Sequence, residues 1–282
     1  MLGRVSNSID LVRASWSVLK ADKELLVFPV ISSVVLVVVL ATFLVPTAVL
    51  SPTLLEGLDG ETLSPVALIG AFLLYFVEYA IIIFFNTALV GAAMIRLDGG
   101  DPTVADGLRI ATSRLGTILG YAALAATVGV ILRAIRERSG TLGRIVAGLF
   151  GLAWSLATYL AVPVLVVRGG SPVDVVKESS AILKRTWGEQ IAGNLGMGLA
   201  FTIVYLGVFV CGLVLVALAN AVGSGILVVV AIALLVLALL LTGLVHSALS
   251  GIYSAALYRF AMGQSIGSGF DRSALESAFT TR

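Results

Sequence analysis

Residues 96–121, RLDGGDPTVADGLRIATSRLGTILGY, decide how this chain is organised. The stretch lies between two long apolar runs and joins a Gly-Gly-x-Pro turn to a helical pattern of apolar residues. It recurs at 168–194 as RGGSPVDVVKESSAILKRTWGEQIAGN, and a weaker copy without the turn opens the chain at 8–27. We interpret each copy as an amphipathic helix that lies on a membrane face and leads into a transmembrane helix.

The composition is that of a membrane protein. Of the 282 residues, 59% are hydrophobic and 12% are charged, whereas soluble domains are about 45–50% apolar and about 25% charged. The formal net charge of +2 comes from scattered residues, which argues against a nucleic-acid-binding surface. Cys211 is the only cysteine, so neither an intramolecular disulfide nor a cysteine cluster for zinc is expected.

Six apolar runs are long enough for the roughly 20 residues that a bilayer requires. The predicted spans are residues 25–50, 65–95, 115–132, 145–167, 191–218 and 226–258. Charged residues occur throughout residues 1–24, which is unlike a signal peptide, so the first span is expected to remain in the membrane. The predicted fold is therefore an all-α, polytopic transmembrane bundle, with loops at 51–64 and 133–144 and a polar tail at 259–282 whose residues 273–279 form a short helix.

The repeated stretches predict a parallel, threefold repeat of one amphipathic helix followed by two spans. Its units are 8–95, 102–167 and 172–258, within a single membrane domain that covers residues 1–282. Each amphipathic helix carries an acidic residue three positions before a basic one, a spacing that suits an ion pair on a helix surface. The pairs are Asp10 and Arg13, Asp106 and Arg109, and Asp174 and Lys177. In the first helix, Trp16 on the apolar side suits a bilayer interface, although the same face could pack on a protein partner.

The distribution of Lys and Arg predicts the orientation. With six spans, fourteen of these residues fall on the side of the N-terminus and four on the other side. Because cytoplasmic segments are rich in Lys and Arg, both termini are expected in the cytoplasm and the protein in the cell membrane.

The four exceptions, Arg133, Arg136, Arg138 and Arg144, all fall in one predicted outer loop. Arginine suits bidentate contacts with phosphate, so these residues could bind lipid headgroups or an acidic solute. Alternatively, they end a helix and extend towards any headgroups, with Glu137 neutralising part of their charge. If the short third span did not cross, the loop would lie inside, but one copy of the repeated stretch would then lie outside.

Polar residues inside the spans are candidates for function because charge is costly there. Glu78 lies within the second span and could carry a proton or a small solute, or it could be a protonated structural residue. His246, the only histidine, could titrate near neutrality or could be a core residue whose hydrogen bonds are satisfied. Asn86 is expected to join helices through hydrogen bonds.

No enzyme signature is present: HExxH, GxSxG, a phosphate loop and a pair of intramembrane aspartates are all missing. The sequence therefore predicts a non-enzymatic protein without cofactor or metal that binds or organises lipids or a membrane partner, with self-association left open. The alternative is a small-solute or proton-coupled transporter that uses Glu78.

Three stretches carry a resemblance to known proteins: residues 99–121, residues 133–167 with RAIRERSGTLGRIVAGLFGLAWSLATYLAVPVLVV, and KRTWGEQIAGN at 184–194. Together with the tail GFDRSALESAFTTR, they resemble a family of integral membrane proteins of unknown function from archaea and bacteria. This resemblance implies six membrane spans, but it gives no indication of a mechanism. The repeated unit is also loosely similar to the membrane domain of some glycerophosphodiester phosphodiesterases, but no catalytic barrel accompanies it here.

Overall fold

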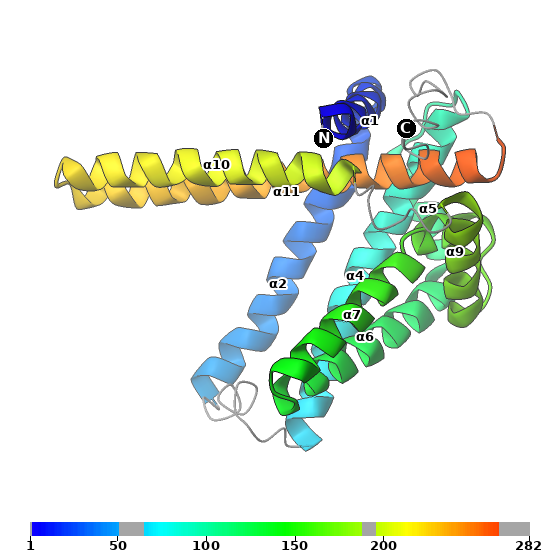
Figure 1. The fold of residues 1–282 in the computed structure, drawn as a ribbon, viewed down its shortest axis with the longest axis horizontal. Coiled ribbons are helices and arrows are strands. Elements are labelled where there is room, and N and C mark those ends of the chain that lie inside the picture. The colour runs from blue at the N-terminus through cyan, green and yellow to red at the C-terminus, as the bar shows by residue number, and fades with distance from the viewer. Residues whose placement is uncertain (1, 51–64, 188–195, 265–282) are drawn as a thin grey trace. The chain divides into compact units, whose positions relative to one another are not determined.

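The computed structural model describes residues 2–50, 65–187 and 196–264, and within these ranges the chain forms helices and no strands (Figure 1). The predicted loop at 51–64 and the short helix at 273–279 lie outside the described residues. The described helices are α1 (Leu2–Ala21), η1 (Lys23–Leu26), α2 (Val27–Leu50), α4 (Pro65–Leu97), α5 (Val104–Ser113), α6 (Leu115–Arg138), α7 (Thr141–Ala157), α8 (Ala161–Val167), α9 (Pro172–Trp187), α10 (Gly196–Ala221) and α11 (Gly225–Ala261).

Six helical segments are long and apolar enough to cross a membrane, which confirms the prediction of a helical chain with six candidate spans. They are Lys23–Phe43, Leu68–Leu97, Leu115–Arg136, Thr141–Val167, Ala200–Ala221 and Gly225–Ala261. The last contains 37 residues, about 55 Å of helix, whereas the hydrocarbon core of a bilayer is about 30 Å thick. This helix is therefore long enough to tilt or to extend beyond the bilayer.

The chain divides into two compact units. Unit 1 contains Met1–Leu26, Met94–Asp101 and Trp187–Arg282, and unit 2 contains Val27–Ala93 and Pro102–Thr186. In unit 1, α10 and α11 form an antiparallel hairpin, and α1 lies against both of them. The close approach of α10 to α11 requires a glycine at Gly212, where any Cβ would collide with the Leu235 side chain.

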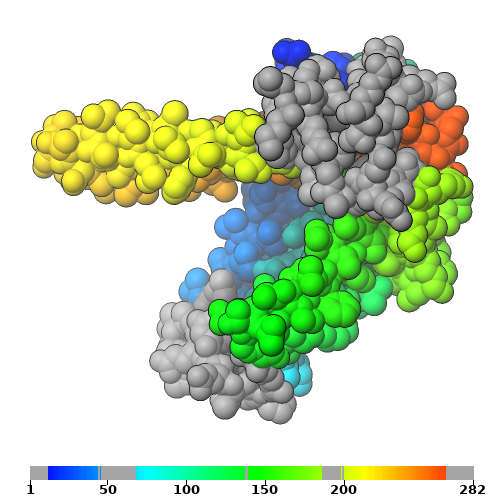
Figure 2. Space-filling model, viewed as in Figure 1, coloured from blue at the N-terminus to red at the C-terminus, as the bar shows by residue number. Residues whose placement is uncertain are grey.

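The α10–α11 hairpin, yellow and orange in Figure 2, is covered with apolar side chains along much of its length. Leu206, Val229 and Leu240 each leave more than half of their surface exposed. Because soluble proteins rarely expose continuous apolar surface of this extent, the hairpin surface suits contact with lipid.

Unit 2 is built around α4. Helix α5 packs on it so closely that a Cβ on Gly91 would lie 2.9 Å from the Ile110 side chain, and one on Gly107 would lie 2.7 Å from the Ala88 carbonyl oxygen. Helices α6 and α7, both green in Figure 1, run side by side. The first residue of α9 packs on α6, where a Cβ on Gly120 would lie 2.7 Å from Cγ of Pro172.

The two Gly-Gly-x-Pro sequences that were predicted to be turns do form turns in the structure. Gly99 has φ +88°, and Gly169 and Gly170 have φ +63° and +98°, so all three occupy the left-handed region that favours glycine. Each turn ends the preceding helix. Pro172 is the first residue of α9, whereas Pro102 lies two residues before Val104, where α5 begins after its cap residue Thr103. The sequence prediction of a helix stop and restart at these positions is correct.

One predicted boundary is wrong, and one predicted span contains a turn that was not predicted. The fourth span falls within the candidate membrane span Thr141–Val167, but α7 ends at Ala157 and α8 begins at Ala161. Pro163 explains the break, since it has no N–H to donate to the carbonyl of Tyr159, four residues earlier. The predicted polar loop at 133–144 is mostly helix, because α6 continues to Arg138 and α7 begins at Thr141.

Candidate functional site

The four unusual arginines lie at the tip of the α6–α7 hairpin. Arg133, Arg136 and Arg138 are on the last turns of α6, and Arg144 is on the first turn of α7. Helix α6 continues past the apolar run because Ala, Ile, Arg and Glu are good or adequate helix formers, whatever their polarity. The structure thus brings the arginines of both helices to one short turn.

The turn itself is tight. The N–H of Ser139 donates to the Ile135 carbonyl at 3.1 Å, and the N–H of Arg144 donates to the Gly140 carbonyl at 3.2 Å. A Cβ on Gly143 would collide with the Ser139 side chain, so the two helices join without room for a larger residue there. The hairpin therefore presents its arginines from a short, defined turn.

The arginines differ in their surroundings. Arg136 and Arg144 are exposed, Arg133 is half-buried, and the side chain of Arg138 lies outside the described part of the molecule. Large apolar side chains lie on the same hairpin end, with Leu142 80% exposed and Ile145 55% exposed. Exposed guanidinium groups beside exposed apolar surface match the two halves of an anionic lipid, namely its phosphate and its acyl chains.

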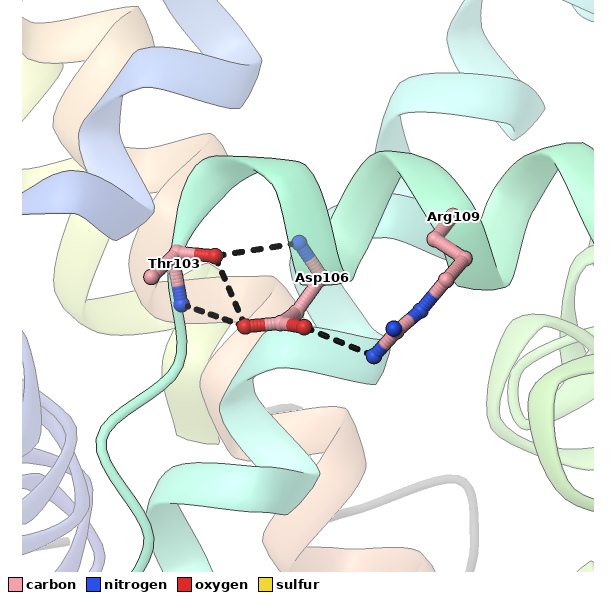
Figure 3. A network of polar contacts seen from close by, with 3 residues as sticks. All are labelled: Thr103, Asp106 and Arg109. Carbon is pink, nitrogen blue, oxygen red and sulfur yellow. Dashed lines mark hydrogen bonds and ion pairs between the residues drawn. The ribbon is translucent and has the colours of Figure 1, made fainter.

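A second cluster of polar side chains lies at the N-terminal end of α5 (Figure 3). The Thr103 hydroxyl accepts the Asp106 N–H at 3.2 Å, and the Asp106 carboxylate accepts the Thr103 N–H at 3.1 Å, which is a capping box. Arg109 donates to the same carboxylate at 2.7 Å. The hydrogen bond from the Thr103 hydroxyl holds the pKa of Asp106 below its usual range. This network stabilises the helix start and leaves no reactive group.

The predicted pairs of the other two helices differ from this one. In α9, the Ser171 hydroxyl donates to the Asp174 carboxylate at 2.6 Å and accepts the Asp174 N–H at 3.3 Å. Lys177 is exposed, and the ion pair that anchors this helix is Arg168 with Glu178 at 2.9 Å. In α1, Arg13 is exposed, and the side chain of Asp10 lies outside the described residues.

The intramembrane candidates fall in different units. Glu78 and Asn86 are half-buried on α4 in unit 2. His246 is half-buried on α11 in unit 1, where its ring stacks on Phe201 with centroids 4.1 Å apart. The Tyr205 hydroxyl lies 3.4 Å from Nδ1 of His246. Through this hydrogen bond and this ring stacking, His246 contributes to the packing of α11 against α10.

The break between α7 and α8 was not foreseen from the sequence. Its Leu160 N–H donates to the buried Ser179 hydroxyl of α9 at 3.0 Å, which replaces a lost helical hydrogen bond. Arg114 donates to the Val167 carbonyl at 3.4 Å, and Thr117 donates to the Gly170 carbonyl at 3.0 Å. Pro163 could have predicted the break from the sequence. No residue near the break, however, predicts that the Ser179 hydroxyl of α9 accepts the hydrogen bond from the Leu160 N–H.

Unit 1 contains a charged cluster that the sequence analysis also missed. Arg259 is 6% exposed and pairs with the Asp98 carboxylate. The Arg259 hydrogen bond holds the pKa of Asp98 below its usual range. Nearby, Arg96 donates to the Gly100 carbonyl at 3.2 Å and to Asp101 at 3.3 Å. The pair of Asp98 with Arg259 joins the segment Met94–Asp101 to α11 within unit 1, and the Arg96 contacts close the turn inside that segment.

Asp22, between α1 and η1, is buried in the same unit, and one of its carboxylate oxygens has no hydrogen-bond partner among the described residues. Burial raises the pKa of Asp22 above its ordinary value of 3.8. The Asp22 carboxyl therefore binds a proton more tightly in the folded protein than in the unfolded chain. Above the raised pKa, where Asp22 is ionised in both states, its buried charge lowers the free energy of unfolding.

We expect Asp22→Asn to increase the free energy of unfolding at pH 7 by about 1 kcal/mol, because the amide removes a buried charge without a full set of partners. The advantage should shrink as the pH falls towards the pKa of Asp22, where the wild-type carboxyl is itself protonated. Denaturation of the purified protein in detergent between pH 4.5 and 8 measures this difference. Glu24→Gln, which changes an exposed carboxylate two positions away, is the control, and a loss of stability at pH 7 in Asp22→Asn would contradict the assignment.

Comparison with known proteins identifies a family for this chain. No curated protein matches the chain. Residues 65–269, which run from the start of α4 past the end of α11, match the family described as "Family of unknown function (DUF6159)". This match covers most of the sequence, including the α6–α7 hairpin and both glycine turns, and the chain belongs to this family.

Proposed function

We propose that this protein is a non-enzymatic, multi-pass protein of the cell membrane that binds anionic lipid headgroups at the α6–α7 tip. The observation that carries the proposal is the convergence of arginines from two helices on one tight turn, beside exposed Leu142 and Ile145. Guanidinium groups form bidentate contacts with phosphate, and the apolar side chains offer a surface for the adjoining acyl chains.

The number of arginines at the tip distinguishes a binding site for anionic lipid from arginines that extend to any headgroup. A single exposed ion pair in water contributes at most about 1 kcal/mol. Each basic residue near an anionic membrane surface contributes about 1 kcal/mol, so Arg133, Arg136 and Arg144 together would contribute about 3 kcal/mol towards anionic lipid. That is on the order of a hundredfold preference, whereas arginines that only extend to headgroups would show little preference for anionic ones.

The proposal places both termini in the cytoplasm and the α6–α7 tip on the outer face, as the excess of Lys and Arg at the other ends predicts. In the same proposal α1, α5 and α9 lie at the inner interface as the three copies of the repeat. In α1, Trp16 is 38% exposed and the Lys20 ammonium lies 5.7 Å from its ring centroid, a pairing suited to headgroups.

We expect the purified wild-type protein to retain anionic phospholipid through mild detergent extraction, and the triple variant Arg133→Gln, Arg136→Gln, Arg144→Gln to lose most of it. Phospholipid per protein, measured by mass spectrometry of the extracted lipids, gives the comparison. The matched control, Arg109→Gln, Lys177→Gln, Lys184→Gln, removes the same charge from exposed positions on α5 and α9. Equal loss in both triples would show that overall charge, and not the tip, retains the lipid.

A second candidate function, a transporter that uses Glu78, is favoured by the break between α7 and α8. Discontinuous membrane helices are typical of transporter binding sites, because they free backbone groups at membrane depth. The break lies in unit 2, which also contains Glu78. The lipid-binding proposal remains the first, since the Leu160 N–H freed by the break is already satisfied by Ser179.

For the transporter, we expect proteoliposomes to show a solute or proton flux that depends on pH, because a carboxylate at membrane depth must bind and release its cargo or a proton. Glu78→Gln should abolish this flux, whereas Asn86→Ala, on the same helix, should retain most of it. Fluorescence of an entrapped pH indicator measures the proton component. Flux that survives Glu78→Gln would remove Glu78 from the mechanism.

A further inference from the structure

The N-terminal helix α1 is attached to unit 1 by one side only. Val18 and Leu19 are buried on that side, where α1 lies against α10 and α11. On the opposite side, Trp16 and Lys20 are exposed. A single buried stripe therefore holds this half of the helix, and any group that is costly to bury on that stripe weakens the attachment of α1.

Two polar side chains interrupt this buried stripe. Ser15 lies three positions before Val18, and Asp22 lies four positions after it, so all three fall on one side of the helix. Both polar residues are buried. The Ser15 hydroxyl and the Oδ2 atom of Asp22 have no hydrogen-bond partner among the described residues. Each group loses its hydration without full compensation, so both oppose the docking of α1.

Asp22 also joins α1 to the helix that follows. Its N–H donates to the Val18 carbonyl at 3.0 Å, which continues the hydrogen bonding of α1, and its carbonyl accepts the Leu25 N–H at 3.4 Å in η1. Its carboxylate accepts the Glu24 N–H. A movement of Asp22 towards water therefore displaces the junction of α1 and η1.

The charged groups nearest to Asp22 do not pair with it. Among the described residues, Asp22 forms no ion pair. Arg96 is close enough to attract its charge, but this guanidinium group donates to the Gly100 carbonyl at 3.2 Å and pairs with Asp101 at 3.3 Å. The carboxylates of Asp101 and Glu24 both repel the charge of Asp22. An ionised Asp22 is therefore poorly compensated where it lies.

The two helices that pack against α1 add no compensating cation. Helix α10 contains no Asp, Glu, Lys, Arg or His. On α11 the only such residues are His246, whose ring stacks on Phe201, and Arg259, which pairs with Asp98. The tyrosines of both helices are neutral near pH 7, because the ordinary pKa of tyrosine is about 10. Burial is accordingly the largest influence on Asp22 and raises its pKa.

We propose that protonation of Asp22 controls how firmly α1 docks on α10 and α11. A neutral carboxyl leaves the buried stripe intact, whereas an ionised one places an unpaired charge in it and loosens the junction of α1 and η1. Docking is thus firmest in acid and weakens as the pH rises and Asp22 ionises. This device is independent of the lipid site, because the α6–α7 tip belongs to unit 2.

Hydrogen–deuterium exchange of the purified full-length protein, followed by mass spectrometry, tests this control. Variants are compared at the same pH, so the intrinsic pH dependence of exchange cancels. At pH 8 we expect the amides of residues 12–26 to exchange about fivefold more slowly in Asp22→Asn than in the wild type, because the amide carries no charge into the interface. At pH 4.5 the difference should be smaller, since the wild-type carboxyl is increasingly protonated.

Ser15→Ala is the matched control, because it removes the other unpartnered group of the same stripe and leaves the charge of Asp22 unchanged. It should slow exchange of the same amides by a factor that does not depend on pH. Helix α7, in unit 2, is the internal reference and should exchange equally in all variants.

Three results would overturn the proposal. Asp22→Asn could exchange as the wild type does at pH 8, or its difference from the wild type could persist undiminished at pH 4.5. Slowing of α7 as large as that of α1 would show general stabilisation in place of local docking. A Ser15→Ala effect with the same pH dependence would likewise show that Asp22 is not the titrating group.

Discussion

Replacing Gly107 by leucine is expected to prevent stable folding of unit 2, and Gly107→Ala to destabilise it by about 3 kcal/mol, at the upper end of overpacking costs. A Cβ at this position would lie 2.7 Å from the Ala88 carbonyl oxygen and would also collide with the Phe28 ring. The phenyl ring could turn, but the carbonyl belongs to the backbone of α4 and can move only with that helix. The added side chain therefore separates α5 from α4.

The measurement is the free energy of unfolding in detergent, followed by helical circular dichroism. Gly148→Ala is the matched control, because Gly148 lies within α7 and an added Cβ there meets nothing within 4 Å. That control should be neutral or gain up to about 1 kcal/mol from the better helix propensity of alanine. Equal stability of Gly107→Ala and Gly148→Ala would show that α5 does not pack on α4 as described.

Gly169→Ala is expected to destabilise unit 2 by about 3 kcal/mol, through two separable costs. The left-handed conformation at φ +63° costs a residue with a Cβ about 1–2 kcal/mol. In addition, the Cβ would lie 2.6 Å from Nη1 of Arg114, whose guanidinium group donates to the Val167 carbonyl at the end of α8. Arg114 would have to leave that carbonyl, which loses a further hydrogen bond to a charged group.

Gly170→Ala separates these two costs. Gly170 also has a left-handed backbone, with φ +98°, but a Cβ there meets nothing within 4 Å. It should therefore show only the backbone cost, and the difference between the two variants gives the contribution of Arg114. If the two variants unfold at the same denaturant concentration, the contact between Arg114 and the α8–α9 turn contributes nothing to stability.

Local patterns in the sequence predicted the helical elements well. Long apolar runs identified six membrane helices, and the Gly-Gly-x-Pro turns placed the start of α5 and α9, because glycine and proline act on the backbone within a few residues. The extension of α6 to Arg138 was not predicted, because the end of an apolar run marks only the end of the membrane-spanning part of a helix. The helical hydrogen bonds continue through the polar residues that follow.

Contacts between distant residues could not be predicted in this way. The pairing of Asp98 with Arg259 and the hydrogen bond from Leu160 to Ser179 depend on how helices pack, and neither residue pair carries a local signal. The approach of Tyr75 and Tyr79 to Gly129 is of the same kind. The sequence did single out Glu78 and the four arginines, because charge is rare in apolar runs, but their neighbours came only from the fold. The threefold repeat and the looser resemblance to phosphodiesterase membrane domains stay predictions.

The central claim is that the α6–α7 tip selects anionic headgroups, and native mass spectrometry of lipid binding tests it most directly. The purified protein is titrated with phosphatidylglycerol and, separately, with phosphatidylcholine, and the bound lipids are counted for the wild type and for the Arg133→Gln, Arg136→Gln, Arg144→Gln variant. We predict that the wild type binds phosphatidylglycerol at least tenfold more tightly, as expected for several basic residues at one surface, and that the variant loses this preference. Equal binding of the two lipids by the wild type, or a preference unchanged in the variant, would contradict the account.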